Sequence, residues 1–144
     1  MESWRFQTTN EYIDFLDFHD CIVSNIKITS GFITVQFEFI NVSPEHPLNP
    51  FEVAKSTGVC ELTFHGVTHC KAILFNEENV EQLVPAENLI EMEVLKFDQN
   101  MVTLGCIFRI FGTEWRSQKF CEWNIQAQGF SVCWNDFNED AWYV

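Results

Sequence analysis

The sequence predicts a mainly β fold, an antiparallel sandwich or open barrel of about eight strands with a short N-terminal helix. Segments that alternate apolar and polar residues recur along the chain, and short turns rich in glycine, asparagine or aspartate separate them. Because no helix-length segments connect these strands, a parallel sheet is not expected. The 144 residues and the 47% content of hydrophobic residues fit one core, so we expect a single domain over 1–144.

Two segments predict short helices. Thr8 followed by Glu11 fits a capping box, in which each side chain satisfies a free backbone N–H at the start of a helix. Apolar residues then recur at helical spacing, which predicts a helix from Thr8 to Leu16. The acidic segment from Glu77 to Val84, just before Pro85, is the second expected helix.

The clearest strands form a hairpin. Ile22–Thr29 and Ile33–Phe39 alternate apolar and polar residues, and Ser30-Gly31 between them supplies a tight turn. Prolines between Ser43 and Thr57 predict a long loop, because proline cannot donate to a sheet. A turn is expected at Asp98–Asn100. The other expected strands are 60–65, 68–76, 90–97, 101–111, 115–126 and 130–134.

The apolar faces of these strands predict the core. Most of the 15 phenylalanines are expected inside, because a phenyl ring has no polar group to keep near water. The core residues that we predict are Ile33, Val35, Phe37, Phe39, Leu62, Phe64, Leu104 and Phe108.

The charge is strongly acidic. Lys and Arg total 8 and Asp and Glu total 21, for a net charge of −13. This balance argues against binding to nucleic acid or to an anionic membrane, since both require basic patches. It is compatible with a basic protein partner, and it also keeps a phenylalanine-rich chain soluble.

The cysteines are expected to be reduced thiols. The segment Met1–Arg5 has no features of a signal peptide, and no apolar run reaches transmembrane length, so we expect a cytoplasmic protein. Disulfides are rare in that compartment. The six cysteines are Cys21, Cys60, Cys70, Cys106, Cys121 and Cys133.

Three arrangements of residues are candidates for chemical sites. Cys60, His65, His69 and Cys70 could converge in a hairpin as zinc ligands, but their spacing matches no common zinc pattern, and exposed histidines with buried cysteines explain it more simply. His19-Asp20 resembles part of a phosphohydrolase site without the further ligands such a site needs, so a turn is the simpler role. A Cys–His nucleophile has no local motif here. We therefore predict no catalytic residue, cofactor or metal.

Acidic and aromatic residues are the candidates for partner binding. The acidic segment comprises Glu77, Glu78, Glu81, Glu87, Glu91 and Glu93, which could face a basic partner or only water. Tryptophans at 115, 123, 134 and 142 are either core fillers or binding hot spots. Those at 134 and 142 are expected to be exposed in the acidic tail, and the Pro44–Pro50 loop is a further contact candidate. The candidate partner-binding residues are Glu77, Glu78, Glu81, Trp134, Trp142 and Tyr143.

Three stretches carry a resemblance to known proteins. The stretch 18–28, FHDCIVSNIKI, resembles the opening of small, largely uncharacterised bacterial β proteins, in which an HD pair leads into the first strand. The stretches 58–67 (GVCELTFHGV) and 130–134 (FSVCW) are similar to later strands of these proteins. Some of them are regarded as immunity proteins of contact-dependent or polymorphic toxin systems. The resemblance implies a non-enzymatic β domain.

Three hypotheses of function follow. The first is a non-catalytic domain that acts by protein–protein interaction, with an immunity protein that binds a basic toxin as one form. The second is a small-ligand-binding β-barrel or sandwich with an aromatic-lined pocket. The third, ranked last, is a hydrolase built on Cys or His.

Overall fold

The computed structural model describes residues 4–144 and contains two five-stranded sheets and one four-stranded sheet, all antiparallel. The first sheet has the order β1 (Phe6–Thr9), β13 (Gly129–Trp134), β7 (Cys60–His65), β4 (Phe32–Phe37), β3 (Val23–Thr29). The second has the order β10 (Met92–Val102), β11 (Gly105–Glu114), β12 (Lys119–Ala127), β8 (His69–Phe75), β9 (Glu81–Val84). The third has the order β14 (Phe137–Asp140), β6 (Lys55–Thr57), β5 (Asn41–Val42), β2 (Leu16–Asp17). The expectation of a mainly β, antiparallel fold is confirmed, and the sheets do not close into a barrel.

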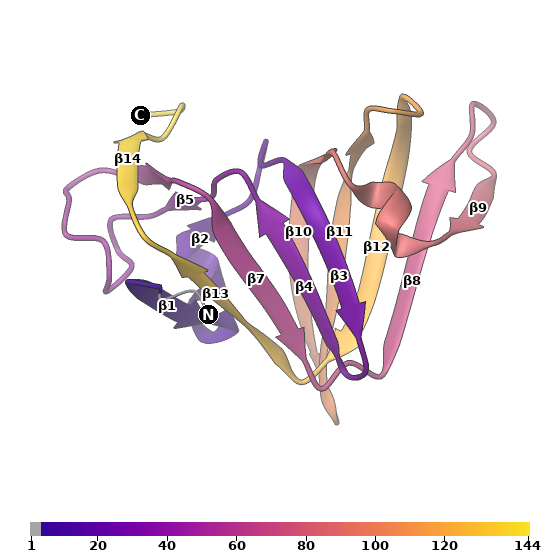
Figure 1. Cartoon of the computed structure of the whole chain (residues 1–144), viewed down its shortest axis with the longest axis horizontal. Helices are drawn as coiled ribbons and strands as arrows, with labels where there is room; N and C mark the ends of the chain where they lie inside the picture. The colour runs from indigo at the N-terminus through magenta and orange to yellow at the C-terminus, as the bar shows by residue number, and fades with distance from the viewer. Residues whose placement is uncertain (1–3) are drawn as a thin grey trace.

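The two large sheets face each other and meet at one end (Figure 1). There the turns between β3 and β4, β7 and β8, and β12 and β13 lie together. Val67 N–H donates to the Gly31 carbonyl at 3.0 Å, and Gln128 N–H donates to the His65 carbonyl at 2.9 Å. The opposite end, which is the upper rim in Figure 1, carries the C-terminal strand β14 and the β8–β9 turn.

A cluster of phenylalanine rings fills the space between the large sheets. Phe64 and Phe130 of the first sheet contact Phe108 of the second sheet, with ring centroids 5.0 and 5.5 Å apart. Phe18 and Phe97 extend the cluster, stacked at 4.4 Å. Burial confirms most of the predicted core, namely Ile33, Val35, Phe37, Leu62, Phe64 and Phe108, and Phe39 packs against it half-buried.

The predicted hairpin is present as β3 and β4, with one difference. Ile26 pairs with Val35 and Ile28 with Ile33, but the register shifts between Val23 and Asn25. This bulge reverses the faces of the residues before it, so Val23 is buried. Ile28 keeps the parity of buried Ile26, but it lies beside the turn at the end of edge strand β3 and is 44% exposed.

Neither predicted helix is present. Thr8 belongs to β1, where it pairs with Val132, and the 3-10 turn η1 (Asn10–Phe15) follows. Its cap is Thr9, whose hydroxyl accepts from Glu11 N–H at 3.4 Å, in place of the expected capping box of Thr8 and Glu11. Residues 77–84 form a turn and the edge strand β9. The only other helical element among residues 4–144 is the 3-10 turn η2 (Ala86–Leu89).

The hairpin of β10 and β11 turns later than expected. Strand β10 continues through Asp98–Asn100 to Val102, so the expected turn there is wrong. Thr103 and Leu104 form the tip instead, and Leu104 is 79% exposed rather than in the core. Apolar and polar residues continue to alternate through the turn, so alternation alone does not show where the strand ends.

The proline-containing loop is shorter than expected. It gives way to β6 at Lys55, and buried polar residues hold its conformation. His46 Nδ1 accepts from Leu48 N–H at 3.0 Å, and its Nε2 lies 2.9 Å from the Thr8 hydroxyl. Asn49 donates to the carbonyls of Val42 and Val53.

Candidate functional site

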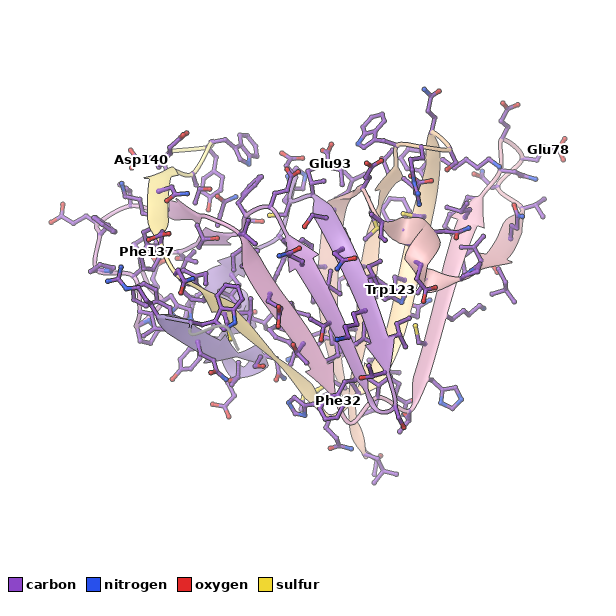
Figure 2. All side chains as sticks on the ribbon, in the orientation of Figure 1. Phe32, Glu78, Glu93, Trp123, Phe137 and Asp140 are labelled. Atoms are coloured by element: carbon purple, nitrogen blue, oxygen red, sulfur yellow. The ribbon has the colours of Figure 1, made fainter. Side chains whose placement is uncertain are left out.

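Acidic side chains gather along one rim of the molecule, which we call the acidic edge. Its carboxylates belong to Asp20, Glu38, Glu91, Glu93, Glu139 and Asp140. Backbone contacts bring these segments together: Glu38 N–H donates to the Ile22 carbonyl at 3.0 Å, and Ile22 forms a β-bridge with Glu93. Figure 2 shows Glu93 and Asp140 on the same upper rim.

Two strained residues fix the backbone of the acidic edge. Asp20 N–H donates to the Val94 carbonyl and Glu91 N–H donates to the Val23 carbonyl, each at 2.7 Å. Both residues have positive φ, 68° and 75°, a conformation that costs an L-residue about 1–2 kcal/mol. These hydrogen bonds link β10 to β3 and to the turn that precedes it. Backbone strain of this kind is concentrated at functional sites.

Two exposed tryptophans flank the acidic edge. Trp115 is 53% exposed, and its indole Nε1 donates to the Glu93 carboxylate at 3.2 Å. Trp142 is 63% exposed, and its ring centroid lies 6.1 Å from that of His19. The acidic edge therefore combines carboxylates with exposed indole rings, and tryptophan is enriched among the residues that dominate protein-binding energies.

A cavity opens at the β14 end of the acidic edge, beside β5 and β6. It has a volume of about 410 Å³, and its polar lining includes Glu38, Asn41, Thr57, Glu139 and Asp140, with Trp142 beside them. A bulge in β14 shapes it. Phe137 pairs with Thr57 and Asp140 pairs with Lys55, so the two residues between them on β14 stand opposite a single residue of β6.

Asn41 lines this cavity with a buried side chain that has no partner. It is 1% exposed, and neither Oδ1 nor Nδ2 has a hydrogen-bond partner among residues 4–144. An unpaired buried polar group costs about 1–3 kcal/mol, so such groups are rare. Asp140 is already paired, with Lys55 Nζ 2.7 Å from its carboxylate. Within the described chain, Glu38 and Glu139 form no ion pair.

The residues predicted to bind a partner fall into two groups. Glu77, Glu78 and Glu81 are exposed around the β8–β9 turn, and Figure 2 places Glu78 on the same rim as Glu93. Trp142 and Tyr143 are exposed at the other end of that rim. The exposure of all these residues agrees with expectation, whereas their role in binding stays a prediction.

The prediction that Trp134 is exposed is wrong. Its side chain is fully buried, stacked on Phe6 with ring centroids 5.6 Å apart, and Phe137 packs against it at 5.8 Å. Phe6 comes from β1 and Phe137 from β14, so segments far apart in the sequence cover the ring. Trp134 therefore cannot contact a partner in this fold.

The cysteines and histidines weighed as zinc ligands do not converge. Cys60 is buried where β7 begins, and His65 is exposed where β7 ends. Cys70, which was expected to be buried, is exposed, and its Sγ accepts a hydrogen bond from the indole Nε1 of buried Trp123 at 2.9 Å. No group of three or more His, Cys, Asp or Glu side chains suited to a metal occurs among residues 4–144.

The thiols lack the environment of an activated nucleophile. Burial is the main cause that raises the pKa of each of the six cysteines, and it raises the pKa of Cys121 to about 12. A nucleophilic cysteine requires the opposite shift, because the thiolate is the reactive form. His19 and Asp20 lie 3.2 Å apart at the turn before β3.

Sequence reasoning missed Glu38, Asn41, Glu139 and Asp140 as site residues. Glu38 follows an alternating strand, and the alternation predicts only that its side chain faces solvent. Glu139 and Asp140 were noted only as part of an acidic tail. Nothing local distinguishes Asn41, because the lack of partners depends on β6 and β14 packing around it.

Comparisons with models of protein families, with curated proteins and with solved structures found no match to the chain. Among residues 4–144, no helix has the length and apolar character needed to cross a membrane.

Proposed function

We propose that this protein is a non-catalytic domain that binds a basic protein through the acidic edge. The observation that carries the proposal is the gathering of carboxylates from distant segments between Trp115 and Trp142. Opposite charge on the partner would speed the encounter, and the exposed indole rings would supply apolar contact area. An immunity protein that covers the basic surface of a toxin is the form that the resemblance of 18–28 suggests.

The interior favours this proposal over the small-ligand alternative. A ligand-binding barrel or sandwich would keep a cavity between its aromatic residues, but here the phenylalanine rings pack against one another across the sheets. The cavity at the acidic edge is peripheral, and carboxylates, amides and hydroxyls line it together with Phe39 and Trp142. The raised pKa values of the thiols disfavour the Cys-based hydrolase alternative.

The test compares two variants with the same change in net charge. Glu91→Gln/Glu93→Gln removes carboxylates from the acidic edge, whereas Glu11→Gln/Asp14→Asn removes exposed carboxylates from the distant η1 turn. Affinity capture from the native host should recover a basic protein with the wild type and the η1 variant, and much less with the edge variant. Association with that partner should slow as salt rises, since salt screens exposed charges beyond about 10 Å at 0.1 M. Equal capture by both variants would contradict the proposal.

A second measurement addresses the immunity form directly. If a toxin gene lies beside the gene for this chain, expression of the toxin alone should stop growth, and co-expression of the wild type should restore it. The edge variant should protect less well than the η1 variant. Protection that is unchanged in the edge variant would locate the toxin contact elsewhere.

A further inference from the structure

We infer that the cavity beside β14 receives an arginine side chain, a conclusion that rests on the proposed binding of a basic protein. The cavity, about 410 Å³, is far larger than a single metal ion requires and is open to solvent at the acidic edge. Its lining combines three features that together suit a guanidinium group: free carboxylates, an unpaired buried amide and an exposed indole ring.

The carboxylates define the charge of the occupant. Glu38 enters the cavity wall from the segment after β4, and Glu139 enters from the bulge of β14. Neither forms an ion pair in the described chain, while Asp140 is held by Lys55 at 2.7 Å. A cation is therefore attracted to Glu38 and Glu139. Arginine offers five N–H donors in a planar fork that matches carboxylate oxygens.

The buried amide indicates that the cavity needs an occupant with hydrogen-bonding groups. Asn41 is 1% exposed and both of its polar side-chain atoms lack partners. Native proteins pair nearly all such groups, so an unpaired amide on a cavity wall marks a position where a partner is missing. Asn41 Oδ1 has almost no accessible surface, so donation by a guanidinium N–H requires a local shift of the cavity wall. The other N–H groups of the same fork reach the exposed carboxylates of Glu38 and Glu139 directly.

The indole ring favours guanidinium over ammonium. Trp142 lines the cavity and is 63% exposed, with the rings of His19 and Tyr143 at 6.1 and 5.5 Å from it, so part of the indole ring remains open to a ligand. A guanidinium stacks on an aromatic face and keeps its edge free for hydrogen bonds, whereas an ammonium is more strongly hydrated and has no planar face.

A bulge in β14 contributes two residues to the cavity wall. In a regular antiparallel pair, every second pair of opposed residues exchanges backbone hydrogen bonds, and the strands pair along their length. The extra residue between Phe137 and Asp140 leaves Asn138 and Glu139 without regular pairing, and both line the cavity. Bulges commonly re-aim a side chain at a binding site.

The first test uses N-acetyl-arginine amide as the probe and the full chain labelled with ¹⁵N. Titration should shift the Asn41 side-chain amide and the Trp142 indole resonances to saturation. The variant Glu38→Gln/Glu139→Gln should weaken this binding by about tenfold or more, because charge-assisted hydrogen bonds are lost. The matched control Glu11→Gln/Asp14→Asn makes the same change in net charge at the distant η1 turn and should leave binding unchanged.

A second variant separates binding from folding. Asn41→Leu replaces the unpaired amide with an apolar side chain of similar size, so thermal stability should stay the same or rise while probe binding is lost. Marked destabilisation by Asn41→Leu would contradict the view that the amide lacks partners. Absence of saturable shifts at Asn41, equal shifts in Glu38→Gln/Glu139→Gln, or equal affinity for N-acetyl-lysine amide would overturn the inference.

The partner assay distinguishes this inference from the proposed function. If a captured basic protein binds Glu38→Gln/Glu139→Gln as tightly as the wild type, the arginine cavity is refuted and the acidic edge stands. If the probe saturates the cavity but no basic protein binds the acidic edge, the proposed function is refuted while the cavity keeps its guanidinium specificity. Substitution of one partner arginine by lysine should weaken only the wild-type complex, and equal weakening with Glu38→Gln/Glu139→Gln would refute the cavity contact.

Discussion

Truncation of Phe37 to alanine tests the register of the first sheet. Phe37 is 1% exposed, pairs with Val23 and Cys60 on the neighbouring strands, and packs on Phe18 with ring centroids 5.5 Å apart. Removal of a fully buried phenyl ring costs about 3–5 kcal/mol, through lost transfer free energy and the cavity that remains. This is a large part of the roughly 5–15 kcal/mol that stabilises a typical domain.

Phe32 provides the matched control on the same strand. It lies five positions earlier in β4, so its side chain points to the opposite face, and it is 50% exposed. Phe32→Ala should therefore cost less than about 1 kcal/mol, the scale of a surface substitution. A shift of β4 by one residue would reverse the two results.

The assay is urea unfolding followed by far-UV circular dichroism and by the fluorescence of the buried tryptophans. Phe37→Ala should lower the midpoint with little change in slope, and should lower Tm by about 10–20 °C. A loss below about 1 kcal/mol for Phe37→Ala, or a comparable loss for Phe32→Ala, would refute the register and the burial argument.

Three further predictions concern Cys70, His46 and zinc. Cys70→Ala should destabilise the protein by about 1–2 kcal/mol because it leaves the buried Trp123 indole without an acceptor. Cys70→Ser should cost less, because its hydroxyl can still accept. Equal costs of the two variants in urea unfolding would contradict the role of the sulfur. Burial lowers the pKa of His46 from its usual 6.5, so the unfolded chain binds the proton more readily. Above about pH 6.5, His46 should not lower the free energy of unfolding, and this free energy should fall as pH drops toward the folded pKa. His46→Gln should reduce this fall, whereas exposed His65→Gln should leave it intact. Protein purified without chelator should contain no stoichiometric zinc by elemental analysis, and zinc that survives dialysis would contradict this.

The alternating segments of the sequence were enough to predict most of the large sheets. Ile33, Val35 and Phe37 on β4, and Leu62 and Phe64 on β7, face the core as their period of two requires. These strands have long runs of regular alternation and a glycine turn at Gly31, so local pattern and tertiary pairing agree. The acidic character of the surface was likewise fixed by composition.

Local patterns failed where a distant segment competed for the same residues. The capping sequence at Thr8 predicts a helix, but pairing of β1 with β13 extends the backbone there instead. The acidic residues before Pro85 predict a helix, but β8 offers an edge that takes Glu81–Val84 as a strand. Trp134 reads as part of an exposed tail until Phe6 and Phe137 cover it.

The sequence by itself determined the mainly β, antiparallel fold class, the apolar faces of the alternating strands that become the core, and the acidic net charge. Only the tertiary structure decided where that charge is concentrated. Glu38, Glu93 and Glu139 are separated by dozens of residues and meet because the bridge at Ile22 and the bulge in β14 bring three sheets to one rim. The unpaired amide of Asn41 depends on the same packing. Whether a buried side chain has a hydrogen-bond partner is decided by all the segments that pack around it, so no local sequence pattern predicts it.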